Sequence, residues 1–169
     1  MEFLPKVQTI LAFDRSKTVR FVRSFLACRR YMRLPAEDHP ATALEILQQE
    51  DPTFFQESIP RSGQALVRFC TTEDALFYLK EIEDIVLCIV ADRKENAIYL
   101  SKLVKCIEQS MTDLISNRCP LHAETFRIDL DTFTFVIDAM IDDGVVISIN
   151  PEKVVTEVKP FVLTKLPNR

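Results

Sequence analysis

The stretch Ile85–Ile115, with the sequence IVLCIVADRKENAIYLSKLVKCIEQSMTDLI, holds the two strongest structural signals of the chain. Its first part, Ile85–Val90, has no polar residue on either face, which predicts a strand that is central in its sheet and covered by helices on both sides. From Arg93 to Ser116, apolar residues recur with the 3.6-residue period of an amphipathic helix. The residues in that period are Ala97, Leu100, Val104, Ile107, Met111 and Leu114. We therefore expect a central strand followed by a long helix.

Four segments that precede the central strand also have the composition of β-strands. Val7–Phe13 and Val19–Phe25 flank a polar turn, and this arrangement predicts a hairpin. Gln64–Thr72 and Ala75–Glu83 are separated from each other and from the central strand by acidic turn residues. These two strands and the central strand that follows them are therefore expected to run antiparallel in succession. The sheet would then have five strands.

The segment between the two groups of strands, Leu34–Gly63, is rich in proline. A short helical pattern formed by Ala41, Leu44 and Leu47 lies among these prolines, and each proline ends a helix or precedes one. We expect one helix of roughly ten residues between extended loops. Residues 31–62 are therefore expected to form a proline-rich segment with little regular structure outside this helix.

The C-terminal third predicts two more helices. Gly144 is expected to end the first of them at C′, because glycine adopts positive φ freely. Asn150 is expected to cap the second, with Pro151 and Glu152 in its first turn. The apolar residues that mark the first helix are Phe133, Val136, Ile137, Met140 and Ile141.

The order of these elements predicts an α+β fold, in which a five-stranded antiparallel sheet has helices on both faces. The length of 169 residues suits a single domain that spans residues 1–169 and ends in a short C-terminal tail.

The composition argues against several classes of function. A net charge of −4 disfavours a basic nucleic-acid binder, because phosphate contacts need clustered Lys and Arg. With only Gly63 and Gly144 as glycines, the chain lacks a glycine-rich phosphate loop. The cysteines form no CxxC pair and lie mostly in apolar runs, which favours reduced thiols in a cytosolic protein. No secretory signal is visible and no apolar run approaches the ~20 residues that span a bilayer, so we expect neither secretion nor membrane insertion.

Candidate catalytic and metal-binding groups are few, because the chain has only two histidines. Cys119 and His122 could be half of a zinc site or a nucleophilic pair, but no second ligand pair, orienting group or oxyanion hole is recognisable. Asp129 and Asp131 could act as paired carboxylates, although a helix-capping role for Asp131 is simpler. We expect no enzyme activity, no metal and no cofactor.

The segment from Lys17 to Arg33, KTVRFVRSFLACRRYMR, is basic and contains no acidic residue. Its interleaved aromatic residues could indicate single-stranded nucleic acid or an anionic membrane. Arg20 and Arg23 are explained more simply as charges that guard an edge strand. The rest of the segment is expected at a protein interface, where arginine is enriched. The interface candidates here are Arg29, Arg30, Tyr31 and Arg33.

Two further pairs of residues are candidates for a partner interface. Phe54 and Phe55 lie in the loop DPTFFQESIP, where they could fold back onto the core or contact a partner. Asp142 and Asp143 lie beside the expected C-terminus of a helix, where negative charge is unfavourable. They could be solvated residues without a role, paired carboxylates for acid–base work, or contacts of a basic partner.

The segment FTFVIDAMIDDGVVISINPEKVV, residues 133–155, resembles the C-terminal part of the zeta subunit of the coatomer vesicle coat. The shared pattern is an apolar helix, an Asp-Gly stop followed by valines, and an Asn-Pro start into a Val-Val helix. Glu95, Asn96 and Leu100 also stand at matching places in the long helix. The resemblance covers Gln64–Val158 and Val7–Phe25, whereas Tyr31–Ser62 does not align.

The resemblance implies a longin-type fold, which coatomer zeta shares with the small sigma chains of clathrin adaptors. It implies a non-catalytic small subunit that forms a heterodimer with a large helical-solenoid coat chain, the gamma subunit in coatomer. The complex would be recruited by an Arf-family GTPase and would serve transport between the endoplasmic reticulum and the Golgi. The chain itself would be cytoplasmic and only peripherally associated with Golgi or coated-vesicle membranes.

This chain departs from the family pattern at two places. Asp143 stands where the zeta pattern has a second glycine, so Asp143 must accept a strained conformation or the helix must end differently. Some sigma chains bind dileucine signals in an apolar pocket, but the matching positions here are Asp84 and Asn117, so this activity is not carried over.

Three alternatives to the zeta-like subunit stay open. A diverged sigma-type adaptor chain would have the same fold and a different coat. A longin-domain regulator of tethering or SNARE machinery would bind a short peptide or a GTPase. A small enzyme that depends on a cysteine or a carboxylate would need a site that the sequence does not reveal.

Overall fold

The main sheet of the protein has five strands, and the predicted number and directions are confirmed. The computed structural model describes residues 5–25, 33–50, 52–55, 66–115 and 121–163. The strands follow the order β2-β1-β5-β4-β3, and all neighbours are antiparallel. Their bounds are β1 (Val7–Asp14), β2 (Val19–Ser24), β3 (Val67–Thr71), β4 (Ala75–Ile82) and β5 (Ile85–Asp92).

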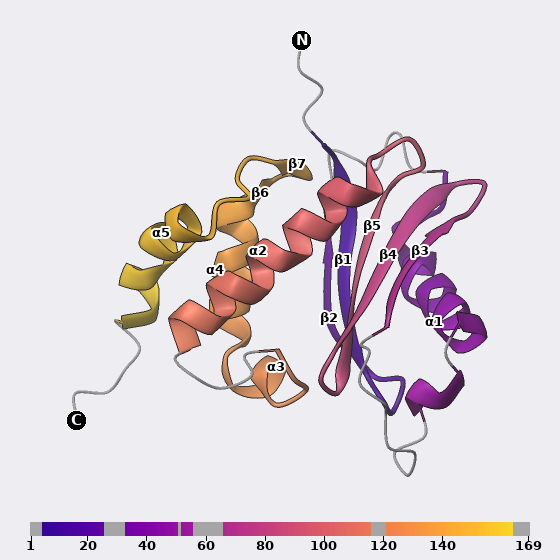
Figure 1. The fold of residues 1–169 in the computed structure, drawn as a ribbon, viewed down its shortest axis with the longest axis horizontal. Coiled ribbons are helices and arrows are strands. Elements are labelled where there is room, and N and C mark those ends of the chain that lie inside the picture. Colours follow the sequence, from indigo (N-terminus) through magenta and orange to yellow (C-terminus); the bar gives the residue numbers. More distant parts are fainter. Residues whose placement is uncertain (1–4, 26–32, 51, 56–65, 116–120, 164–169) are drawn as a thin grey trace.

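Helices cover both faces of this sheet, as predicted (Figure 1). On one face lie α1 (His39–Glu50) and the 3-10 helices η2 (Ala36–Asp38) and η3 (Pro52–Phe55). The other face is covered by a larger group of helices. These are α2 (Ala97–Ile115), α3 (Thr125–Ile128), α4 (Leu130–Met140) and α5 (Pro151–Leu163). The order of long elements matches the prediction, and α3 was not predicted.

Strand β5 is the centre of the molecule. It hydrogen-bonds to β1 along one edge and to β4 along the other, and every residue except Asp92 is buried. Leu87 and Ile89 point into the core beneath α2 and α4, whereas Val86 and Cys88 point into the core beneath α1. Complete burial raises the pKa of the Cys88 thiol, so this cysteine stays protonated and has no nucleophilic character.

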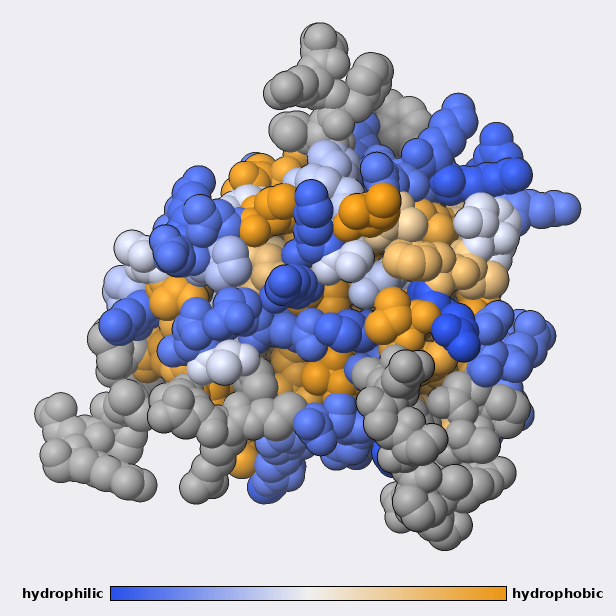
Figure 2. Space-filling model, viewed as in Figure 1, coloured by the Kyte–Doolittle hydropathy of each residue, from blue (hydrophilic) through white to orange (hydrophobic). Residues whose placement is uncertain are grey.

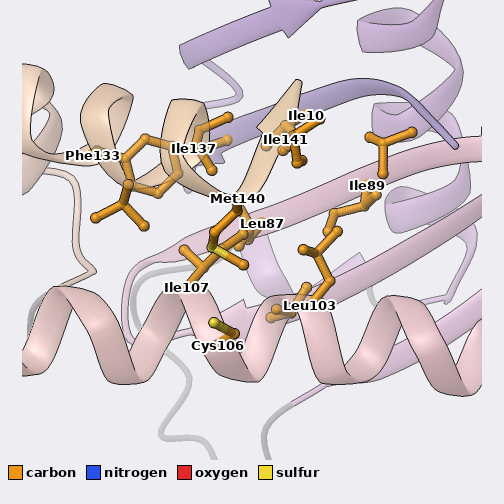
Figure 3. Packing of buried hydrophobic residues seen from close by; sticks show 14 of the residues in the cluster. Ile10, Leu87, Ile89, Leu103, Cys106, Ile107, Phe133, Ile137, Met140 and Ile141 are labelled. Atoms are coloured by element: carbon orange, nitrogen blue, oxygen red, sulfur yellow. The ribbon is translucent and has the colours of Figure 1, made fainter. Parts of the chain in front are cut away.

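The larger core lies between the sheet and the helices α2 and α4. Figure 3 shows Leu103 and Ile107 of α2 and Met140 of α4 lying close to Leu87 of β5. Both helices therefore bury the apolar face that their sequence periodicity predicts, and most of their stability comes from this packing.

The end of α4 corrects the prediction for Gly144. The helix stops at Met140, and the next residues form a small hairpin, β6 (Ile141–Asp142) and β7 (Val145–Val146). Its two-residue turn consists of Asp143 with φ 44° and Gly144 with φ 88°. Two successive positive φ angles are typical of a type I′ turn. Gly144 therefore serves this turn and not the C′ position, and Asp143 takes the left-handed conformation that aspartate tolerates better than most residues.

Contacts with the start of β1 hold this hairpin in place. The backbone N–H of Val7 donates to the carbonyl of Gly144 over 2.7 Å, and the N–H of Val146 donates to the carbonyl of Pro5 over 3.0 Å. The N–H of Lys6 also donates to Glu95 Oε1 just before α2. The hairpin is thus fixed by residues that lie far away in the sequence.

The helix starts confirm one prediction and correct another. Asn150 caps α5, because its Oδ1 accepts a hydrogen bond from the N–H of Glu152 over 3.0 Å. The N-cap of α4 is Asp129, whose side chain makes no capping bond, and Asp131 lies within the first turn. Asp131 is therefore not the capping residue, although its charge still lies near the positive end of the helix dipole.

Phe54 and Phe55 both turn toward the protein. Phe54 is fully buried in the core beneath α1, and the partly buried Phe55 meets it edge-on with 5.4 Å between ring centroids. The β1–β2 turn places Arg15 over the Phe54 ring and Lys17 over the Phe55 ring, in cation–π geometry. Folding back onto the core is the correct alternative, and the assignment of Phe54 to a partner surface is wrong.

A buried histidine joins α1 to the sheet. His39 is the first residue of α1 and is completely buried. Its Nδ1 lies 2.8 Å from Oγ1 of Thr9 on β1, and this hydroxyl lies 3.1 Å from Oγ of Ser24 on β2. Burial lowers the pKa of His39, and the Leu34 backbone and two nearby carboxylates oppose this shift only in part.

The burial of Phe54 predicts that Phe54→Ala lowers the free energy of unfolding by about 3–5 kcal/mol, because the substitution leaves a cavity in the core. Phe55→Ala is the matched control and should cost less, because Phe55 is only partly buried. Urea unfolding followed by circular dichroism measures both. Equal losses in the two variants would contradict the assignment of Phe54 to the core.

The low pKa of His39 predicts that acid destabilises the fold through this residue. Above the ordinary histidine pKa of about 6.5, the ring is neutral in the folded and the unfolded chain. At lower pH the unfolded chain binds a proton that the folded chain rejects, so stability falls by up to about 1.4 kcal/mol per pH unit until the folded pKa is reached. His39→Gln, which does not titrate, should lack this loss. The prediction would be contradicted if the wild type and His39→Gln gave parallel curves of unfolding free energy against pH.

Candidate partner interface

The structure places the predicted interface residues in different parts of the molecule. Residues 29–31, which include both arginines and the tyrosine of the basic segment, lie outside the described residues. Arg33 is exposed and is followed by Leu34, which packs against the core beneath α1. Asp142 and Asp143 are exposed at the β6–β7 hairpin, on the side of the sheet that carries α4. Of the candidates that the structure describes, Arg33 and the acidic pair Asp142 and Asp143 therefore lie on opposite faces of the sheet.

Asp142 and Asp143 border a hollow of about 520 Å³, which we call the acidic hollow. It lies between the end of edge strand β2, the last turn of α4 and the β6–β7 hairpin. It has three carboxylates and one guanidinium, so its lining is negatively charged. Its lining residues are Arg23, Ser24, Phe25, Asp138, Ile141, Asp142 and Asp143.

An ion pair crosses the acidic hollow. Nη2 of Arg23 on β2 lies 2.6 Å from Oδ1 of Asp138 on α4, and both side chains are nearly half exposed. An exposed pair of this kind contributes at most about 1 kcal/mol. The pair neutralises the charge of the Asp138 carboxylate.

A second, smaller hollow of about 230 Å³ lies between α4 and α5, and we call it the apolar hollow. The rings of Phe135 and Phe161 lie 5.6 Å apart along it, and Phe161 is 58% exposed. Asp138 borders both hollows. The residues that line the apolar hollow are Phe135, Asp138, Ala139, Glu157, Val158 and Phe161.

Sequence reasoning found only part of this surface. Asp142 and Asp143 were predicted as interface candidates, whereas Asp138, Glu157 and Phe161 were missed. Arg23 was predicted as a guard of an edge strand, and it does lie on the edge strand β2. The available signal for the apolar hollow was Phe161, which lies one turn after Glu157 on the otherwise polar side of the last helix.

Lys17 and Arg20, two other described residues of the basic segment, contact the protein itself. Arg20 binds Asp14 through Nε at 2.6 Å, and Lys17 lies over the Phe55 ring. Burial alone would raise the pKa of Asp14, but hydrogen bonds from Ser16, Arg20 and Thr18 outweigh it, so that the pKa is lowered. These basic side chains therefore offer no continuous surface to nucleic acid or to an anionic membrane.

Exposed apolar residues also occur away from the two hollows. In Figure 2, apolar side chains gather over the region where Figure 1 draws β3 and β4. Phe69 of edge strand β3 is 48% exposed, and its ring packs on Tyr78 of β4 with 4.9 Å between centroids. Arg68 of the same strand pairs with Glu50 of α1 over 3.2 Å, which places a charge on this edge.

The catalytic and metal-binding candidates do not assemble into a site within the described part of the chain. Cys119 lies outside that part, and Nδ1 of His122 accepts a hydrogen bond from the N–H of Glu124. No group of three His, Cys, Asp or Glu side chains that could hold a metal ion occurs among the described residues.

Asp84 has a structural task, and Asn117 lies outside the described residues. Oδ1 of Asp84, in the β4–β5 turn, accepts a hydrogen bond from the N–H of Ala123 over 2.9 Å. The carboxylate thus ties this turn to the segment that leads into α3.

No helix among residues 5–25, 33–50, 52–55, 66–115 and 121–163 is both long and apolar enough to cross a membrane.

Comparison with known proteins places the fold. No protein-family model and no curated protein matches the chain. In structure it is similar to a chain of a homology model of the full-length AP-3 complex in a stretched open conformation, with a TM-score of 0.58, 13% identity and 94% of each chain covered. A Roadblock/LC7 domain from Streptomyces avermitilis gives a TM-score of 0.38 at 13% identity over 59% of this chain and 77% of that domain, which is too low to carry an argument. The expected α+β fold, with a five-stranded antiparallel sheet and helices on both faces, is confirmed, and it is similar to the fold of that AP-3 chain.

Proposed function

We propose that this protein is a non-catalytic small subunit of an adaptor-type vesicle coat, most similar in role to coatomer zeta. The observation that carries the proposal is the structural similarity to a chain of an AP-3 adaptor complex model, which extends over 94% of both chains. The zeta-like sequence of residues 133–155 supports the finer assignment.

The mechanism we propose is scaffolding. The sheet and its two helix layers form one body with a core on each face, and the described part of its surface presents charged side chains, two hollows and strand edges. Such a body stabilises a large helical-solenoid coat chain by shape and charge. The heterodimer would act within a larger complex that an Arf-family GTPase recruits to Golgi or coated-vesicle membranes, and this subunit would touch the membrane only through that complex.

Two alternatives remain within the class of binding modules. A sigma-type chain of a clathrin adaptor is favoured by the AP-3 similarity, which concerns an adaptor and not coatomer. A longin-domain regulator of tethering or SNARE machinery would use the same fold for a shorter ligand. The identity of the partner distinguishes all three.

Affinity purification of the tagged chain from its native cell, followed by mass spectrometry, tests the proposal. We expect a large helical-solenoid chain in near-equal amount together with other coat subunits, and the identity of these subunits reports which coat is served. Reciprocal purification through the tagged large chain is the control for specific capture. A chain recovered as a free monomer would contradict the proposal, as would recovery of SNARE or tethering proteins alone.

A further inference from the structure

Strand β3 is an edge of the main sheet within the described part of the chain. It comes last in the order β2-β1-β5-β4-β3, and its register with β4 has no bulge. The carbonyl of Leu66 accepts a hydrogen bond from the N–H of Glu81, which faces it across the ladder. Such hydrogen-bonded pairs alternate along an antiparallel ladder, so Val67, Phe69 and Thr71 direct their backbone N–H and C=O groups away from β4.

The side chains of these three residues suit a strand that pairs with another strand. Val67 is 38% exposed, Phe69 is 48% exposed, and Thr71 is exposed as well. They lie on the face of the sheet where the Phe69 ring packs on Tyr78. β-Branched and aromatic residues pack well against their neighbours across paired strands. A strand added beside β3 would therefore cover apolar surface and also satisfy backbone groups.

The other edge of the sheet is better protected against such pairing. The register between β1 and β2 shifts next to Ala12, and an irregularity of this kind blunts an edge strand. Strand β2 also carries Arg20 and Arg23, and both form ion pairs within the chain. Charged side chains on an edge strand disfavour the approach of another strand. The open edge of the sheet is therefore β3.

Strand β3 carries a single charged side chain, Arg68. Its Nε lies 3.2 Å from Oε2 of Glu50 on α1, and its Nη1 donates to the carbonyl of Val67 over 3.1 Å. A carbonyl oxygen has two lone pairs, so the carbonyl of Val67 can accept a further hydrogen bond. Arg68 therefore does not close the edge.

The length of β3 fits β3 of a second copy. In a two-fold antiparallel pair centred on Phe69, each Phe69 faces the Phe69 of the other copy, and Val67 faces Thr71. All 5 residues of the strand are then paired, and the outward backbone groups meet in hydrogen-bonded pairs. A register centred on either neighbouring residue pairs fewer of them.

The charges beside β3 agree with the same register. Arg68 faces Cys70 of the other copy, whose thiol is neutral at physiological pH because burial raises its pKa. A register centred on Arg68 would place two guanidinium groups opposite each other, which is unfavourable. The ion pairs of Arg68 with Glu50 and of Lys80 with Glu108 balance the charges next to this edge. Two copies can therefore approach without strong repulsion at the contact.

We propose that the protein forms a two-fold dimer, in which the β3 strands of two copies pair antiparallel around Phe69 and join their sheets into one. The two Phe69 rings lie side by side on the face that carries α2, each against its own Tyr78. The guarded β2 strands lie at the outer edges of the joint sheet, so association stops at two copies. The inference goes beyond the proposed function and does not rest on it, because the occupant of the edge is the same chain.

Sedimentation equilibrium of the purified full chain measures this association. One short strand from each copy makes a small interface, so we expect a dissociation constant on the order of 10 µM. Amide hydrogen exchange at low and high protein concentration reports the surface that is used. Exchange of the outward N–H groups of Phe69 and Thr71 should slow as the dimer forms, whereas that of Val22 on β2 should not change.

A matched pair of lysine substitutions tests which edge is used. Phe69→Lys places two ammonium groups opposite each other in the dimer and should weaken it by about tenfold or more. Val22→Lys is the control, because Val22 lies on the edge strand β2 and is 47% exposed, almost as much as Phe69. It should dimerise as the wild type does. Far-UV circular dichroism verifies that both variants are folded.

Paired charges at Val67 and Thr71 test the register. Val67→Lys with Thr71→Lys, and Val67→Glu with Thr71→Glu, each place like charges opposite each other, so each variant alone should be monomeric at concentrations where the wild type dimerises. An equal mixture of the two should form a mixed dimer, because every lysine then faces a glutamate. Val67→Lys combined with Thr71→Glu in one chain should dimerise without a second variant.

Several results would overturn the inference. A wild-type chain that stays monomeric up to about 1 mM has no such dimer. A dimer that Phe69→Lys leaves intact, or that Val22→Lys weakens equally, uses another surface. A mixture of the lysine and glutamate variants that stays monomeric excludes the register centred on Phe69. Each measurement uses the purified chain alone, so none of these results decides whether a coat subunit is the partner in the cell.

Discussion

Burial of β5 on both faces and along both edges is the constraint on which the rest of the structure depends. A strand made only of apolar residues cannot face water, so the chain must supply a strand on each edge and a helix layer on each face. These four demands are met by β1 and β4 on the two edges, each with its outer strand β2 or β3, by helix α1 on one face and by helices α2, α4 and α5 on the other. The two apolar cores are thus joined through the sheet, in which β5 and its neighbours β1 and β4 each contribute side chains to both cores.

This architecture directs function to the surface. The interior of the described part is filled by side chains from both helix layers, and its buried Cys88 stays a neutral thiol. The polar contacts within it, such as the one from His39 to Thr9, fasten elements together. What remains for recognition is the outside, where the hairpin after α4 and the exposed face of α5 bring negative charge and an aromatic side chain together. A rigid body with a charged, partly apolar corner suits a scaffold subunit.

Local patterns in the sequence predicted β5, α2 and the cap at Asn150, because each depends on periodicity or on neighbours a few residues away. The predictions failed where distant residues decide. Gly144 was assigned to a helix end because its bond from Val7, on the first strand, cannot be read from nearby sequence. The acidic hollow was found only in part, because Arg23 and Asp138 are 115 positions apart and meet only in the folded chain. The direction of Phe54 likewise depends on the β1–β2 turn that covers it.

Native-state amide hydrogen exchange tests most directly whether β5 holds both layers together. If it does, the amides of β5 exchange only through global unfolding, with the denaturant dependence of the whole molecule, and α1 and α2 lose their most protected amides in the same step. Amides of the edge strands β2 and β3 should exchange through smaller openings. The account would be contradicted if β5 exchanged at low denaturant together with one helix layer while the other layer stayed protected, because the two layers would then be stable independently of the strand between them.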